Sequence, residues 1–180
     1  MSELVEQGLV RAIGLSNYTT EEIESAHEQR PVDVVQQGLS MLDHLDERPV
    51  IARCGELGIG AVIYEPLASG VLAGGVRSGE DIKEKFGDDI EEWPFFQRLF
   101  APGRMERTVA LIAGVQTVAD GLGATMPQVA IAWVLAQAGV TSAICGTLNA
   151  SHVRDNAGAA EVKLSGEDLA ELDGLVASIS

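Results

Sequence analysis

The feature that most restricts the fold is a short apolar run followed by a helical pattern, repeated four times along the chain. Each run is nearly continuous in apolar residues and rich in β-branched side chains, which is typical of strands buried on both faces. The runs are Val10–Leu15, Val32–Gln36, Ile59–Tyr64 and Val140–Cys145. Strands that alternate with helices predict an α/β fold with a parallel sheet covered by helices.

The helical patterns carry recognisable start signals. Thr19 and Glu22 have capping-box spacing, and Pro127 stands in the first turn of a helix that begins after Thr125. Four other helices are expected. One includes Val50, Ile51 and Leu57 and ends near Gly58, and a second spans Thr108–Leu122. A third opens near Asn149 or Ser151 and continues toward Asn156, and the last spans Leu169–Val176 behind a cap at Ser165. The opening residues 1–10 resemble the end of an amphipathic helix.

One stretch interrupts the alternation. Residues 71–107 contain glycines, acidic clusters and an aromatic patch of Trp93, Phe95, Phe96 and Phe100. We expect a long loop after the third strand, and connections of this length are usually either functional or mobile. Its aromatic residues either contribute to a substrate site or pack the loop onto the sheet; the sequence leaves both open.

Each apolar run ends in polar residues. The carboxyl ends of parallel strands lie at one rim of the sheet, and that rim is where α/β folds build ligand sites. The residues concerned are Ser16-Asn17, Gln36-Gln37, Tyr64-Glu65 and Gly146-Thr147. A strand can also turn polar simply because it reaches solvent, but four consecutive instances favour a ligand site.

Five segments carry a resemblance to a known family. In order and spacing, IGLSNYTTEEI, DVVQQGLSML, IYEPLASGVLAGG, TMPQVAIAWVLAQ and ICGTLNASHVRDNAGA resemble the second half of the aldo-keto reductase barrel. The resemblance covers essentially the whole chain. It implies a (β/α)8 TIM-barrel type fold of which only the last four βα units are present, as a single partial domain over residues 1–180.

The resemblance also implies a site for a nicotinamide dinucleotide. Ser16, Asn17 and Gln36 match residues that hydrogen-bond the nicotinamide carboxamide, and Tyr64 matches the aromatic that stacks on the nicotinamide ring. The residues that match the pyrophosphate and adenosine-phosphate segments are Leu67, Ser69, Gly70, Gly146, Thr147, Asn149, His152 and Asn156. The structural alternatives are a helix cap for Asn17, a satisfied buried amide for Gln36 and a packed ring for Tyr64.

The resemblance names NADPH as the cofactor, with NADH as the alternative. NADPH-selective members of the family carry basic residues where this chain has Gly146 and His152, and only Arg154 is nearby. The implied activity is NAD(P)H-dependent reduction of a small aldehyde or ketone.

The family's catalytic Asp, Tyr, Lys and His belong to the first half of the barrel, and we expect no catalytic residue and no metal site in this chain. Its tyrosines are Tyr18 and Tyr64, and no lysine follows a strand. His44 falls in the loop after the second strand and is expected at the surface, with a substrate-side position as the alternative. The chain alone is therefore predicted to be inactive, and the alternative function is a non-catalytic nucleotide-binding or regulatory half-barrel; an inert remnant is a third reading.

Four strands cannot close a barrel. The expected sheet has two unpaired edges and one uncovered face, which predicts self-association. We also expect the chain to be a fragment of a longer enzyme, with a genuine half-barrel as the alternative.

Composition limits the partners. The formal net charge of −15 argues against nucleic acid or an anionic membrane surface as a partner. The two cysteines, Cys54 and Cys145, show no metal or disulfide pattern, and no apolar stretch reaches membrane length. A cytoplasmic location is the resulting expectation.

Overall fold

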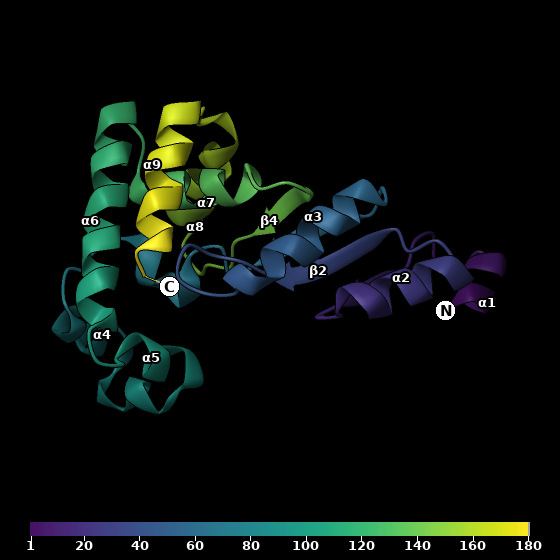
Figure 1. Cartoon of the computed structure of the whole chain (residues 1–180), viewed down its shortest axis with the longest axis horizontal. Helices are drawn as coiled ribbons and strands as arrows, with labels where there is room; N and C mark the ends of the chain where they lie inside the picture. The colour runs from purple at the N-terminus through teal and green to yellow at the C-terminus, as the bar shows by residue number, and fades with distance from the viewer. Residues whose placement is uncertain (180) are drawn as a thin grey trace.

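The computed structural model describes residues 1–179, and its four strands form one parallel sheet in the order β1-β2-β3-β4. The strands are β1 (Gly14–Ser16), β2 (Val34–Gly38), β3 (Gly60–Tyr64) and β4 (Val140–Ile144) (Figure 1). Every neighbouring pair is parallel, with one register irregularity at Ala61/Val62 between β3 and β4. The predicted parallel sheet is confirmed, although β1 is shorter than its predicted run.

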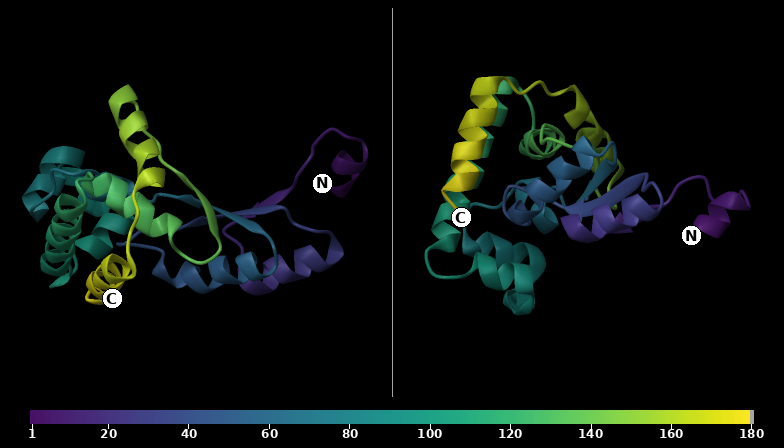
Figure 2. Two further views of the ribbon diagram at one scale, coloured as in Figure 1. Left: turned by 90° about the horizontal axis from the view of Figure 1, so that it is seen from above. Right: turned by 45° about the vertical axis from the view of Figure 1, so that its right-hand side comes forward.

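The two faces of the sheet differ. In β3, Ala61 and Ile63 are buried while Val62 and Tyr64 are partly exposed, and in β2 the buried Val35 alternates with the exposed Gln36. Helices α2 (Thr20–Gln29) and α3 (Arg48–Glu56) lie on one side of the strands (Figure 2). The alternation therefore separates a face packed against helices from an open face.

The open face has a defined set of residues in register. Ser16 pairs with Gln36, Gln36 with Val62, and Val62 with Ser142, so these four form one row across the strands. Within residues 1–179, β1 and β4 each have a strand neighbour on one side only. The predicted self-association through these edges stays a prediction.

The expected helix starts are present. Thr19 Oγ1 accepts from the Glu22 N–H at 3.3 Å, while Glu22 Oε2 accepts from the Thr19 N–H at 2.8 Å, which completes the capping box of α2. The same reciprocal arrangement begins α7 (Met126–Leu135) and α9 (Gly166–Ala177), and Asn149 caps α8 (Ala150–Gly158). These short-range patterns therefore specified the helix starts correctly.

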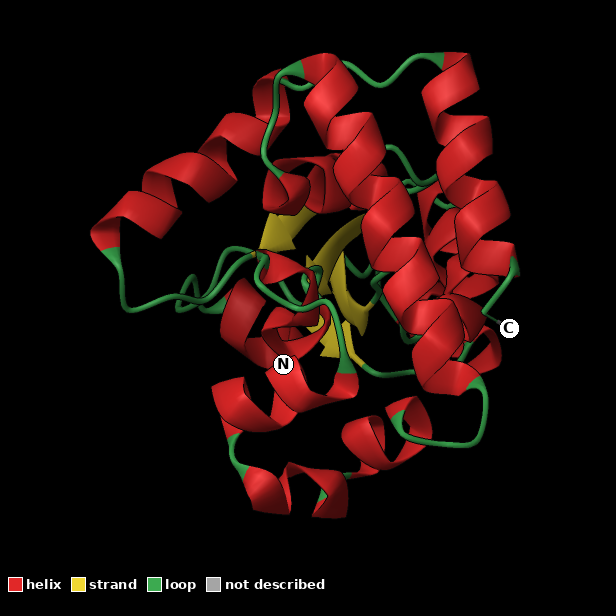
Figure 3. Ribbon diagram, turned by 90° about the vertical axis from the view of Figure 1, so that its left-hand side faces the viewer, coloured by secondary structure: helices red, strands yellow, loops and turns green. Residues whose placement is uncertain are grey.

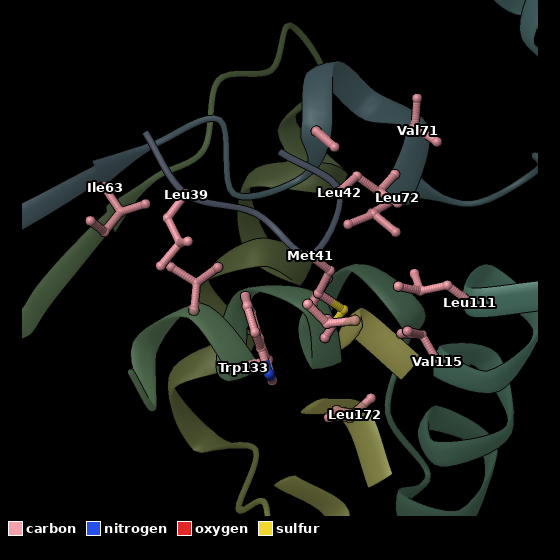
Figure 4. Packing of buried hydrophobic residues seen from close by; sticks show 14 of the residues in the cluster. Leu39, Met41, Leu42, Ile63, Val71, Leu72, Leu111, Val115, Trp133 and Leu172 are labelled. Carbon is pink, nitrogen blue, oxygen red and sulfur yellow. The ribbon is translucent and has the colours of Figure 1, made fainter. Parts of the chain in front are cut away.

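The main core lies between the sheet, α7 and a pair of long helices. Helix α6 (Arg104–Leu122) runs beside α9, and Trp133 of α7 is fully buried among side chains that include Met41, Leu111 and Leu172 (Figure 4). The Trp133 Nε1–H donates to Asp173 Oδ1 at 3.1 Å, so the one polar group of this ring is satisfied.

No single helix in residues 1–179 is long and apolar enough to cross a membrane. Taken together, α6 and α7 have sufficient length and hydropathy, but their axes turn by 95° between them.

The long connection after β3 is mostly helical rather than a loop (Figure 3). It contains the 3-10 helix η2 (Ala68–Ala73), α4 (Gly79–Phe86), the 3-10 helix η3 (Asp88–Glu92) and α5 (Pro94–Leu99). The Phe96 ring is buried, with its centroid 5.2 Å from Phe86 and 4.9 Å from Phe95, whereas Trp93 is 62% exposed. Most of the aromatic patch thus packs the connection together.

The chain begins with α1 (Ser2–Glu6), which has no buried residue and lies at one end of the molecule (Figure 1). The 3-10 helices η1 (Leu45–Glu47) and η4 (Ala159–Glu161) complete the elements of residues 1–179.

Candidate functional site

Asn17 ties three strand ends together. It follows β1 with φ of 59°, a left-handed conformation that asparagine tolerates better than most residues. Its backbone N–H donates to the carbonyl of Gln36 at 3.1 Å and to Gln37 Oε1 at 2.7 Å. Its Oδ1 accepts from the Tyr64 hydroxyl at 2.9 Å. Asn17 is therefore a link between β1, β2 and β3, and the cap of α2 is Thr19 instead.

Gln36 and Gln37 point to opposite faces and have different surroundings. The Gln36 side chain lies on the open face next to Ser16 in the register. Gln37 is 1% exposed, and its Nε2 donates to the Tyr18 carbonyl at 2.8 Å and to Glu47 Oε2 at 3.2 Å. The satisfied buried amide is therefore Gln37, which supports the backbone around Asn17, while Gln36 is free to meet a ligand.

Tyr64 lies on the open face at the end of β3, with its ring against His44. The two ring centroids are 5.8 Å apart in an edge-on arrangement. They meet over Gly38, where an added Cβ would lie 2.7 Å from His44 Cδ2 and 3.0 Å from Tyr64 Cε2. Glycine at this position thus makes room for the pair.

Burial raises the pKa of the Tyr64 hydroxyl, and the nearby carboxylates of Glu65 and Glu47 raise it further. The hydroxyl is consequently protonated at neutral pH and donates to Asn17. His44 Nε2 lies 3.6 Å from Asp43 Oδ2 and 4.0 Å from Glu65 Oε2. His44 is thus partly exposed, as a surface position requires, and lies at the strand rim beside Tyr64.

Beyond this polar rim, a cavity of about 410 Å³ lies between the ends of β3 and β4 and the helix α8. Seven of the predicted cofactor residues line it: Leu67, Ser69, Gly70, Gly146, Thr147, His152 and Asn156. Its remaining lining comes from Glu65, Pro66, Ala73, Pro127, Ile144, Cys145 and Asp155. The predicted residue Asn149 lies outside the lining, and its Oδ1 accepts from the Ser151 N–H at 2.9 Å as the cap of α8.

The segment along one wall of the cavity has unusual backbone geometry. Glu65, Ala68 and Ser69 have φ of 55°, 49° and 53°, and Gly70 has φ of 91°. Left-handed conformations at non-glycine residues cost about 1–2 kcal/mol each and tend to occur at functional sites. The strain therefore supports a ligand-binding role for this wall.

The charges of the cavity are mostly negative. Glu65 and Asp155 are acidic, and His152 is the one lining side chain that can gain a positive charge. Asp155 is fixed from outside, because its Oδ2 accepts from Thr125 Oγ1 at 3.0 Å and its carbonyl accepts from Gln128 Nε2 at 3.0 Å. Burial raises the pKa of the Cys145 thiol, which keeps it in the neutral form.

Two further arrangements are not found in residues 1–179. No hydrogen bond or ion pair joins a lysine to Tyr18 or Tyr64, and no cluster of three His, Cys, Asp or Glu side chains is placed to hold a metal ion.

The sequence analysis placed Gln37 and Glu65 at the strand rim without assigning either a role, and it did not place His44 there. Period-two alternation from the apolar Val35 marks Gln37 as buried, whereas the position of His44 depends on the path of the loop after β2.

Comparison with known proteins bears on the family and the fold. The family model described as the Aldo/keto reductase family matches residues 1–177. Among solved structures, the chain is similar to the thermostable aldo-keto reductase Tm1743, crystallised with the inhibitor epalrestat. The identity is 28% and the TM-score 0.67, and the match covers 97% of this chain and 52% of that one.

This chain therefore spans about half the length of that relative. The predicted fold class is confirmed: the four parallel strands and their helices are a half-barrel of the (β/α)8 type. With both the fold and the family model in agreement, the chain belongs to the aldo/keto reductase family.

Proposed function

We propose that this chain is the cofactor-binding part of an NAD(P)H-dependent oxidoreductase that reduces the carbonyl group of a small aldehyde or ketone. Membership of the aldo/keto reductase family supports the reaction class. The observation that carries the proposal is that the rim around Asn17 and Tyr64 adjoins the 410 Å³ cavity through Glu65, which follows Tyr64 and lines the cavity. A dinucleotide has one end that needs amide partners and another that needs a cavity.

The nicotinamide end would be held at the rim. Ser16, Asn17 and Gln36 offer hydroxyl and amide groups to the carboxamide, and the Tyr64 ring offers a stacking surface. Bound there, the reduced cofactor supplies a hydride to the carbonyl carbon of the substrate. The protein's part is to orient one face of the nicotinamide ring toward the open side of the sheet.

The other end would enter the cavity. Leu67, Ser69 and Gly70 would contact the pyrophosphate, since glycine and a left-handed backbone allow close approach of the main chain. Gly146 and Thr147, before α8, and His152 and Asn156, on α8, line the cavity and would contact the adenosine phosphates. Asn149, which caps α8 outside the lining, would act at the start of that helix. We assign NADPH as the cofactor through the family resemblance, with NADH as the alternative because His152 is the only potential cation in the lining.

Within residues 1–179, the structure shows no evident donor for the proton that the reduced oxygen must gain. Tyr64 already donates to Asn17 and has a raised pKa, and Tyr18 and the lysines are not joined to it. We therefore assign the catalytic acid to residues outside this chain. On that assignment the chain alone binds the dinucleotide without turnover, which is also what a non-catalytic nucleotide-binding module would do.

The test is a titration of the purified chain with NADPH and NADH, followed by nucleotide fluorescence, with carbonyl turnover assayed in parallel. Gln36→Met should weaken binding, because it removes an amide from the open face, while Gln116→Met on α6 is the matched control that should not. Absence of saturable binding to either nucleotide at millimolar concentration would rule out the proposal. Turnover by the chain alone would contradict the assignment of the acid.

A further inference from the structure

The strained wall of the cavity is held from behind by one side chain of the long connection. The Lys85 ammonium on α4 donates to the carbonyl of Gly70 at 3.0 Å and to that of Gly74 at 3.1 Å. These two carbonyls lie on the wall segment 67–74, which carries the left-handed residues Ala68 and Ser69. One cation thus joins two points of the segment that the cavity needs in a fixed shape.

The neighbouring residue adds a packing contact at the same place. A Cβ on Gly70 would lie 3.5 Å from Phe86 Cζ, which places the Phe86 ring directly behind the wall. The Phe86 ring in turn packs on Phe96, with 5.2 Å between centroids, so α4 is anchored to α5. The wall therefore rests on a helical support rather than on solvent.

The surroundings of Lys85 indicate a specific contact rather than a chance surface approach. The Lys85 side chain is exposed, yet its ammonium bonds two carbonyls of one segment at once, and desolvation on that side lowers the pKa of the ammonium. Its helix neighbour Lys83 instead forms an ordinary ion pair with Glu91 at 2.7 Å. Hydrogen bonds from a charged donor are stronger than neutral ones, and these two join the middle of the strained segment at Gly70 to its end at Gly74.

We propose that Lys85 is a positioning residue for the candidate site: it holds segment 67–74 in the shape that forms the cavity wall and thereby sets the affinity for the dinucleotide. Only the claim about dinucleotide affinity rests on the proposed function; the claim that Lys85 holds segment 67–74 does not. It gives the long connection after β3 a role in binding, although Lys85 itself does not line the cavity.

The experiment compares the wild-type chain with Lys85→Met, Lys85→Gln and the control Lys83→Met. Methionine keeps the apolar stem and removes the donors; glutamine keeps a polar end but is too short to bond both carbonyls. Hydrogen–deuterium exchange of peptides covering residues 66–75 is measured first, without nucleotide. The dissociation constants for NADPH and NADH are then measured on the same samples, and a thermal melt verifies folding.

We expect both Lys85 variants to exchange about tenfold faster in residues 66–75 and to bind the nucleotide about tenfold more weakly, the factor that corresponds to one net hydrogen bond. Lys83→Met should match the wild type in both. If Lys85→Met does not melt cooperatively, Lys85→Gln decides the comparison.

Equal exchange in the Lys85 and Lys83 variants overturns the proposal, as does faster exchange with unchanged affinity in a chain that binds the nucleotide. If the wild-type chain binds neither nucleotide, the proposed function fails. In that case, faster exchange in the Lys85 variants but not in Lys83→Met still supports the claim that Lys85 holds the wall. Equal exchange in all variants refutes that claim.

Discussion

Replacing Gln37 with methionine isolates the support beneath the rim. The substitution preserves the length of the side chain but removes two hydrogen bonds to backbone, with the Asn17 N–H at 2.7 Å and the Tyr18 carbonyl at 2.8 Å, and a third with Glu47 at 3.2 Å. A net hydrogen bond contributes about 1 kcal/mol, so the loss of the two backbone bonds should lower the free energy of unfolding by about 2 kcal/mol, and by about 3 kcal/mol with the contact to Glu47.

The adjacent Gln36→Met is the matched control. Its side chain lies on the open face and makes no hydrogen bond within residues 1–179, so the free energy of unfolding should change by less than about 0.5 kcal/mol. Urea denaturation followed by far-UV circular dichroism measures both variants. In a nucleotide titration, Gln36→Met should weaken binding although its stability equals that of the wild type.

Two results would refute this reasoning. If the free energy of unfolding of Gln37→Met lies within about 0.5 kcal/mol of the wild-type value, the buried amide does not support the rim. If Gln36→Met is the more destabilised of the two, the assignment of the two glutamines to opposite faces is wrong, and the register of β2 with β1 and β3 must be wrong with it.

Three smaller changes probe other parts of the molecule. Thr125→Ala removes the capping box of α7 and should cost about 1 kcal/mol in a thermal melt; no loss would mean that the cap is dispensable. Gly38→Ala forces the Tyr64 ring and its histidine neighbour apart and should cost about 1–3 kcal/mol, with weaker nucleotide binding as a second readout. The Ser165 hydroxyl and N–H lower the pKa of Asp168, so this carboxylate stabilises the fold above its unfolded pKa and that stability is lost as pH falls through the folded pKa. Ser165→Ala should therefore raise the pKa of Asp168 toward its ordinary value in an NMR titration, and an unchanged value would contradict the assigned cause.

The elements that the sequence predicted correctly have short-range causes. The capping box at Thr19, the helix start after Thr125 with Pro127 in its first turn, and the apolar runs of β2, β3 and β4 act over a few residues. Pattern and structure therefore agree to within a few positions. The run Val10–Leu15 was less accurate, because only Gly14–Ser16 pairs with β2. Alternation alone does not show where the partner strand begins.

The long connection and the rim were predictable only in part. The helices of residues 79–99 are short and depend on tertiary packing around the buried Phe96, which a local pattern does not report. Likewise the approach of His44 to Tyr64 requires Gly38 to lack a side chain, and the contact of Lys85 with Gly70 spans 15 residues. Contacts of this kind depend on how separate elements meet.

Covering the open face of the sheet and binding the nucleotide at the rim are coupled in this molecule. The row that places Ser16 and Gln36 on the open face also contains Val62, an apolar residue that gains from being covered. Any segment or partner that covers this face therefore buries the apolar positions and encloses the candidate nicotinamide site in the same step. By linkage, whatever covers the face without blocking the rim should raise nucleotide affinity, and bound nucleotide should in turn strengthen the association by the same factor. Measuring that association with and without NADPH would test the coupling, and an association unaffected by the nucleotide would show that the open face and the rim act independently.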